Sequence, residues 1–199
     1  MLAPGFDDPG LAAQAVFRAV MDAMARPGRI GRIAVPLSPP APLGTAMAAV
    51  ALALTDFETP LWLDPTLAGD DGVRRWLAFH TGAPVVAAPA EAAFALVTHT
   101  ADLPRLAAFA QGTDDYPDRS TTLILAVDAL ADDTGATLSG PGIDGETRLS
   151  VPPLGAAFWR ECRLNHAGFP RGVDVLFTAG ERIAALPRST RIAVEAGEI

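Results

Sequence analysis

The residues best suited to hold a charged ligand lie near the end of a predicted helix. Asn165, His166 and Arg171 occur within one short run. An amide, an imidazole and a guanidinium can all donate hydrogen bonds to an anion, and the guanidinium fork matches the geometry of phosphate oxygens. Arg119 and Arg188 offer two more forks of the same kind. This run therefore indicates a surface for a phosphate-like ligand or for a partner protein.

The same run also fits an ordinary helix C-terminus. A histidine at the position of His166 interacts favourably with the negative end of the helix dipole. Gly168 would then terminate the helix and Pro170 would stop its continuation. The two interpretations are compatible, and the sequence favours the structural one slightly.

Three further side chains have a functional and a structural interpretation. His80 falls on the apolar stripe of a predicted helix, which favours a buried or partner-facing histidine over a catalytic one. His99 follows an apolar strand and could form half of a metal site with Asp102, but the sequence offers no third ligand. Tyr116 is the only tyrosine, and we expect its ring to pack rather than react. We therefore predict neither a catalytic residue nor a metal site.

The composition excludes several kinds of chemistry. All 15 basic residues are arginine, so the chain contains no lysine. A Schiff base to pyridoxal phosphate and a lysine-containing phosphate loop are both excluded. Cys162 is the only cysteine, which rules out an internal disulfide and a cluster of iron and sulfur held by this chain alone. We expect no cofactor.

No complete catalytic motif is present. The glycine-rich run at 139–142 is interpreted as a turn, because Pro141 lacks the amide that a phosphate cradle needs. The neighbouring acids are interpreted as helix caps and solvated charges rather than catalytic pairs. These neighbours are Asp70 and Asp71, Asp114 and Asp115, and Asp132 and Asp133.

The charge and the N-terminus argue against several locations and partners. The net charge of −8 opposes binding to nucleic acid or to an anionic membrane. The first residues lack the basic and apolar regions of a signal peptide. The longest uncharged stretch, residues 33–55, is interrupted by prolines and is too short to span a bilayer. We predict a cytoplasmic protein.

Helical and strand patterns alternate along the chain. Helices are expected at 11–26, 44–56, 70–81, 103–111 and 155–168. Strands are expected at 29–35, 59–63, 94–98, 121–127, 137–142, 146–151, 173–178, 182–186 and 190–195. The run TTLILAV at 121–127 is almost wholly apolar, as in a strand buried on both faces. The pattern predicts a single α/β domain, residues 1–199, with helices packed on a mixed sheet.

Seven groups of residues, taken together, are characteristic. They are FRAVMDAMARPG (17–28), LTDFETPLWL (54–63), FHTGAP (79–84), Gly112 with Tyr116 and Pro117 ahead of 120–125, LSGPGI (138–143), FWRECRLNHAGFPRG (158–172) and VDVLFTAGERIAALPRSTRI (173–192). In this order, and over nearly the whole chain, they resemble one family, the H subunit of the bacterial carbon–phosphorus lyase core complex (the PhnH family).

The resemblance implies a fold and a set of partners. The fold is a three-layer α/β sandwich with a mixed sheet, like the major domain of pyridoxal-phosphate-dependent transferases without the cofactor. Family members form homodimers alone and join the G, I and J subunits in a larger complex. The I subunit is held to carry the nucleosidase-like chemistry, and the J subunit holds the iron–sulfur cluster.

The resemblance also implies a function. The complex is linked to a reaction in which a phosphonate displaces adenine from ATP to give a ribose 1-phosphonate 5-triphosphate. We expect the chain to be a structural or accessory subunit for that step, enzymatic within the complex and not alone. The alternative is a subunit that binds ATP or phosphonate. No catalytic residue carries over, and Asn165, His166, Arg171, Arg119, Tyr116, Arg188 and His80 are the candidate ligand- or partner-binding residues.

Overall fold

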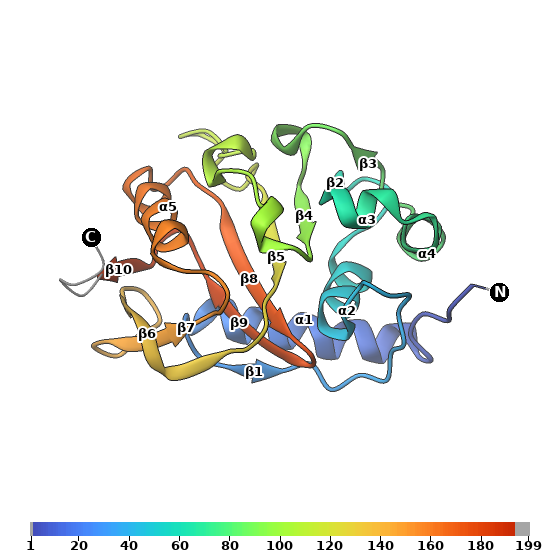
Figure 1. Ribbon diagram of the computed structural model, residues 1–199, viewed down its shortest axis with the longest axis horizontal. Helices are drawn as coiled ribbons and strands as arrows, with labels where there is room; N and C mark the ends of the chain where they lie inside the picture. The colour runs from blue at the N-terminus through green and yellow to red at the C-terminus, as the bar shows by residue number, and fades with distance from the viewer. Residues whose placement is uncertain (1, 194–199) are drawn as a thin grey trace.

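The computed structural model describes residues 2–193. The helices are α1 (Pro9–Ala25), α2 (Thr45–Leu54), α3 (Pro65–Gly69), α4 (Asp71–Thr81) and α5 (Ala156–Ala167), with 3₁₀ turns η1 (Pro89–Glu91), η2 (Thr100–Asp102) and η3 (Leu106–Ala108). The strands are β1 (Gly31–Arg32), β2 (Leu61–Leu63), β3 (Val85–Val86), β4 (Phe94–Val97), β5 (Thr122–Ala126), β6 (Ala131–Ser139), β7 (Thr147–Ser150), β8 (Asp174–Ala179), β9 (Arg182–Leu186) and β10 (Arg191–Ala193) (Figure 1). No helix among these residues is long and apolar enough to cross a bilayer.

The main sheet is mixed, as predicted. Its strands lie in the order β1-β9-β8-β5-β4-β2-β3. The five strands from β3 to β8 run parallel, whereas β9 is antiparallel to both of its neighbours. Leu123, Ile124 and Leu125 in β5 are fully buried, which confirms that this strand is covered on both faces. The α/β class is therefore confirmed, while the likeness to the transferase domain stays a prediction.

A second, smaller sheet consists of β10, β6 and β7, all antiparallel. The strand β6 begins at Ala131, earlier than the sequence indicated, and an irregularity follows Ala131 in its pairing with β7. Gly135 in this segment has a φ of 95°, and an added Cβ would lie 2.2 Å from the carbonyl oxygen of Leu149. Close approach of the two backbones thus requires a glycine there.

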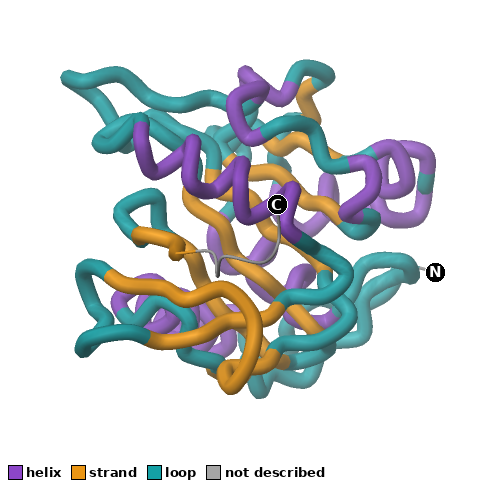
Figure 2. The backbone as a smooth tube through the Cα atoms, turned by 60° about the vertical axis from the view of Figure 1, so that its left-hand side comes forward, coloured by secondary structure: helices purple, strands orange, loops and turns teal. Residues whose placement is uncertain are grey.

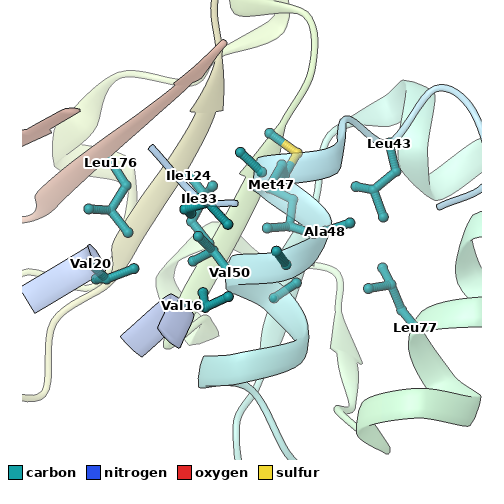
Figure 3. Packing of buried hydrophobic residues seen from close by; sticks show 14 of the residues in the cluster. Val16, Val20, Ile33, Leu43, Met47, Ala48, Val50, Leu77, Ile124 and Leu176 are labelled. Carbon is teal, nitrogen blue, oxygen red and sulfur yellow. The ribbon is translucent and has the colours of Figure 1, made fainter. Parts of the chain in front are cut away.

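One face of the main sheet is covered by α1 and α2. Val16 and Val20 of α1 pack with Met47 and Val50 of α2 in the same core as Leu176 of the sheet (Figure 3). The middle of α2 consists of alanine, valine and methionine and is buried on several sides, because α1, the sheet and α4 all surround it. Small side chains allow these elements to approach α2 closely.

The other face is covered by α5 and by the smaller sheet. Phe158 and Trp159 of α5 pack in one core with Phe177 of β8, and Leu138 and Leu149 of the smaller sheet belong to the same core. Figure 2 shows helices on both sides of the strands. The main sheet therefore separates two hydrophobic cores.

Local capping explains where several helices begin and end. Asp70 accepts a hydrogen bond from the amide of Val73 at 2.9 Å, which confirms the predicted cap of α4. Gly82 ends that helix with a φ of 69°, in the left-handed region that favours glycine. The short helix α3 was not predicted, although Asp64 and Pro65 form a typical helix start.

Two predicted elements differ from the structure. The expected helix at 103–111 is wrong, since only the turn η3 forms there. Gln111 donates its side-chain amide to the carbonyls of Leu106 and Phe109, and Thr121 accepts from the amide of Ala110, so side chains replace helical hydrogen bonds. The strand expected at 29–35 is reduced to β1, and the strand expected at 190–195 extends beyond the described residues.

Candidate functional site

The polar cluster at the end of α5 begins with Asn165. Its side-chain amide donates to the carbonyl of Val173 at 2.8 Å and accepts from the amide of the same residue at 2.8 Å. Val173 is fully buried and lies just before β8. The side chain of Asn165 therefore pairs with the backbone of Val173 as a neighbouring strand would. Both polar atoms of its amide are used to stabilise the fold.

Arg188 is at the centre of the cluster and is largely enclosed. Its Nε lies 3.1 Å from Oδ1 of Asp174, and its Nη2 also donates to that carboxylate. Nη1 donates to the carbonyl of Pro117 at 2.6 Å, and Nη2 to the hydroxyl of Ser120 at 2.5 Å. The two charged side chains are 13% and 14% exposed. Most of the guanidinium donors are thus satisfied within the chain.

His166 joins the same network from α5. Its Nδ1 lies 3.0 Å from the carbonyl oxygen of Arg188, so this contact requires the tautomer or the cation that carries a proton on Nδ1. The helix ends at Ala167, as predicted, and the amide of Gly168 bonds back to the carbonyl of Asn165. The residues that end helix α5 therefore also belong to the polar cluster, so the two interpretations of this run hold together.

The loop at 112–120 carries the exposed part of the cluster. The guanidinium carbon of Arg119 lies 4.1 Å from the ring centroid of Tyr116, in a cation–π contact. Arg171 pairs with Asp114 at 3.2 Å, and both side chains are mostly exposed. Gly112, with a φ of 70°, lets the backbone approach Pro117 closely.

Six of the seven candidate residues are therefore brought to one region. His80 lies apart from them, on α4. Its Nε2 is 3.1 Å from the carbonyl oxygen of Ala3, which also accepts from Nε1 of Trp76 at 2.9 Å. His80 thus holds the N-terminal segment against α4, and an added Cβ at Gly5 would collide with its ring.

A surface cavity of about 490 Å³ lies beside the cluster. Arg188 and Asp174 contribute its polar wall. Phe169, Pro170 and Pro187 contribute apolar walls, and Phe169 is 58% exposed. Such a cavity can receive an apolar group of a ligand or of a partner, with few free donors for an anion.

Asp174 is the residue that sequence reasoning missed. It opens an otherwise apolar strand, and its carboxylate also accepts from the backbone amide of Arg188 at 2.8 Å. An acid as the first residue of a buried strand was the available signal, but its partner is fourteen positions away in the chain. The pairing could not be inferred from spacing.

Asp64 is a second missed residue, at the carboxyl end of β2. It is fully buried and accepts from the amides of Leu67 at 2.8 Å, Thr98 at 2.6 Å and His99 at 3.0 Å, and from the hydroxyl of Thr98 at 2.8 Å. These bonds join β2, α3 and the end of β4. The carboxylate is used by the fold.

Groups of a reactive or metal-binding type are scarce. Burial raises the pKa of the Cys162 thiol far above its ordinary value, so the reactive thiolate is suppressed. Within residues 2–193 there is no group of three or more His, Cys, Asp or Glu side chains able to hold a metal ion.

Comparison with known proteins gives a consistent result. The model of the family described as "Bacterial phosphonate metabolism protein (PhnH)" matches residues 4–193. The chain is 45% identical over 187 residues to "Alpha-D-ribose 1-methylphosphonate 5-triphosphate synthase subunit PhnH" of Rhizobium meliloti (strain 1021), covering 94% of this chain and 93% of that protein. It is 33% identical over 184 residues to "Putative C-P lyase subunit protein HtxG" of Stutzerimonas stutzeri, covering 90% and 85%. The chain belongs to the PhnH family of bacterial phosphonate metabolism proteins.

Proposed function

We propose that the chain is an accessory subunit of an α-D-ribose 1-methylphosphonate 5-triphosphate synthase. It would serve the transferase step in which a phosphonate displaces adenine from ATP, and it would act through contacts with other subunits. The likeness to the Rhizobium meliloti subunit over almost the full length of both chains supports this role. The expected partners are the G, I and J subunits of the carbon–phosphorus lyase complex, and a second copy of the chain when these are absent.

The observation that carries the accessory role is the internal use of the polar side chains. Asn165, Arg188 and Asp64 direct their donors and acceptors to the chain itself. The Cys162 thiol is held protonated by burial. A group that performs chemistry needs a free donor, acceptor or nucleophile at a site that substrate can reach.

The test has two parts, on the full chain. The tagged chain co-expressed with the G, I and J subunits should be recovered with them in a fixed stoichiometry. The chain alone, given ATP and methylphosphonate, should release no adenine, whereas the complex should. Recovery of the chain without partners would contradict the subunit assignment, and adenine release by the chain alone would contradict the accessory role.

A second candidate role is binding of ATP or phosphonate through the cluster at the end of α5. The observation in its favour is that Arg119 and Arg171 are exposed there. Calorimetry should then show binding that is lost when both arginines are replaced by glutamine. Absence of binding at millimolar ligand, in the chain and in the complex lacking the I subunit, would contradict this role.

A further inference from the structure

A larger cavity lies near the carboxyl ends of the parallel strands, whereas the cavity beside Arg188 lies near their amino ends. Its volume is about 660 Å³, and it lies between the segment from Thr100 to Leu106 and the first turns of α5. The strand β4 ends at Val97, just before this segment. The amide of Asp128, after β5, bonds to the carbonyl of Pro152 at 2.8 Å and so ties the start of α5 to the same edge. Ligands of open α/β sheets usually bind outside the carboxyl ends of parallel strands.

The walls of this cavity are mostly apolar. Leu103, Leu106, Leu154, Phe158 and Leu164 contribute to them. Leu164 is 62% exposed although it lies in the middle of a helix that packs on the core. A ligand with an apolar ring would remove this surface from water, which is favourable in proportion to the area buried.

Two arginines lie at the same cavity. Arg105 donates from Nε and Nη2 to one carboxylate oxygen of Glu161, at 3.2 and 3.1 Å, and its side chain is 75% exposed. Arg160 is exposed and forms no ion pair with residues 2–193. Because Glu161 compensates the charge of Arg105, the side chains that line the cavity carry one net positive charge, in a chain whose net charge is −8. Arg160 therefore offers a forked set of donors for the oxygens of a phosphate or phosphonate, and Arg105 adds its Nη1 group, which Glu161 does not use.

We propose that this cavity binds a small molecule of the nucleoside-phosphate class. The ring system would lie against Leu103, Leu154 and Leu164, and the phosphate groups would contact Arg160 and the Nη1 group of Arg105. The cavity volume is within the range of about 300 to 1,000 Å³ that is usual for small-molecule sites. A simple anion would leave the apolar walls exposed, and an apolar molecule would leave the arginines unused. This site does not depend on the proposed function, because the chain alone can be assayed for binding.

The test is calorimetry on the full chain with three probes: ATP, adenosine and inorganic tripolyphosphate. ATP should bind, and each of the other two should bind at least about tenfold more weakly, since each makes only part of the contacts. Arg160→Gln should weaken ATP binding about tenfold, because a charge-assisted hydrogen bond is lost. Ala157→Phe fills the cavity without changing the charge and should weaken binding by at least as much.

Arg18→Gln is the matched control, because Arg18 is an exposed arginine on α1, outside the residues that line the cavity. It should leave binding unchanged, and melting temperatures should show that all variants are folded. The proposal is overturned if millimolar ATP does not bind. It is also overturned if tripolyphosphate binds as well as ATP, if Arg18→Gln weakens binding as much as Arg160→Gln, or if only replacement of Arg119 and Arg171 reduces binding. Failure of the chain to recruit partner subunits would leave this test unaffected.

Discussion

The two ends of α5 differ in how their polar groups are used. At the C-terminal end, Asn165, His166 and Arg188 bond to backbone and side chains of neighbouring segments. On the side that faces the cavity near the N-terminal end, Arg160 has no ion pair with the described part of the chain. Leu164 lines the same cavity, although it directly precedes Asn165 in the sequence, and it presents an apolar side chain to solvent. Both ends lie beside a surface cavity.

This difference separates groups that stabilise the fold from groups that do not. A buried polar group is retained only when its hydrogen bonds are satisfied, and the C-terminal cluster meets this condition. An exposed leucine beside an unpaired arginine adds little to stability. The comparison therefore predicts that substitutions at the C-terminal end reduce folding stability, whereas those at the N-terminal end affect binding.

The largest effect is expected for Arg188→Met. The change leaves the carboxylate of Asp174 in a mostly enclosed place without its charged partner and removes the donors to Pro117 and Ser120. Breaking such a pair destabilises a protein by about 3 kcal/mol. Urea unfolding followed by circular dichroism measures the change.

The double variant Arg188→Met with Asp174→Asn is the control for this prediction. Because the uncompensated charge is then absent, the double variant should lose less stability than the sum of the two single variants. An Arg188→Met variant within about 0.5 kcal/mol of the wild type would mean that the cluster is not a stabilising network.

A smaller effect is expected for Asn165→Ala. The substitution leaves the amide and the carbonyl of the fully buried Val173 without their partner. An unsatisfied buried group costs about 1 to 3 kcal/mol, so a loss of about 2 kcal/mol is expected in the same unfolding experiment. Arg160→Ala, on the exposed side of the same helix, is the matched control. Equal losses in the two variants would contradict the contrast between the ends of α5.

The fold was largely predictable where its cause is local. The strand β5 follows from an apolar run, and α4 follows from an aspartate cap and a terminal glycine. The expected helix at 103–111 does not form, because Phe109 is buried in the core and two side chains bond to backbone groups that a helix would use. Gln111 donates to the carbonyl of Leu106, and Thr121 accepts from the amide of Ala110. Side-chain hydrogen bonds of this kind depend on the folded arrangement of the chain, and the hydrophobic periodicity of the sequence does not indicate them.

The candidate site shows the same limit. The sequence indicated the region around Asn165, His166 and Arg188, because polar residues near a predicted helix end can be recognised from the sequence alone. It gave no indication that Arg188 pairs with Asp174 or that His80 holds the N-terminal segment, because both contacts join distant parts of the chain. The larger cavity was missed altogether, since Arg105 and Arg160 come from two segments that only the fold brings together.

The smallest effect on stability is expected for Arg160→Gln and Leu164→Gln, and this near-absence of an effect is the sharpest test of the comparison. Neither side chain has a hydrogen bond or ion pair to lose within the described chain, and Leu164 is already 62% exposed. Substitutions at such positions usually change stability by no more than about 0.5 kcal/mol. If the unfolding midpoints of both variants equal that of the wild type while ATP binding falls, the two residues act on a ligand. A decrease of more than about 1 kcal/mol in the free energy of unfolding of either variant would instead mean that the residue stabilises the fold, as Arg188 does. The proposed difference between the two ends of α5 would then be contradicted.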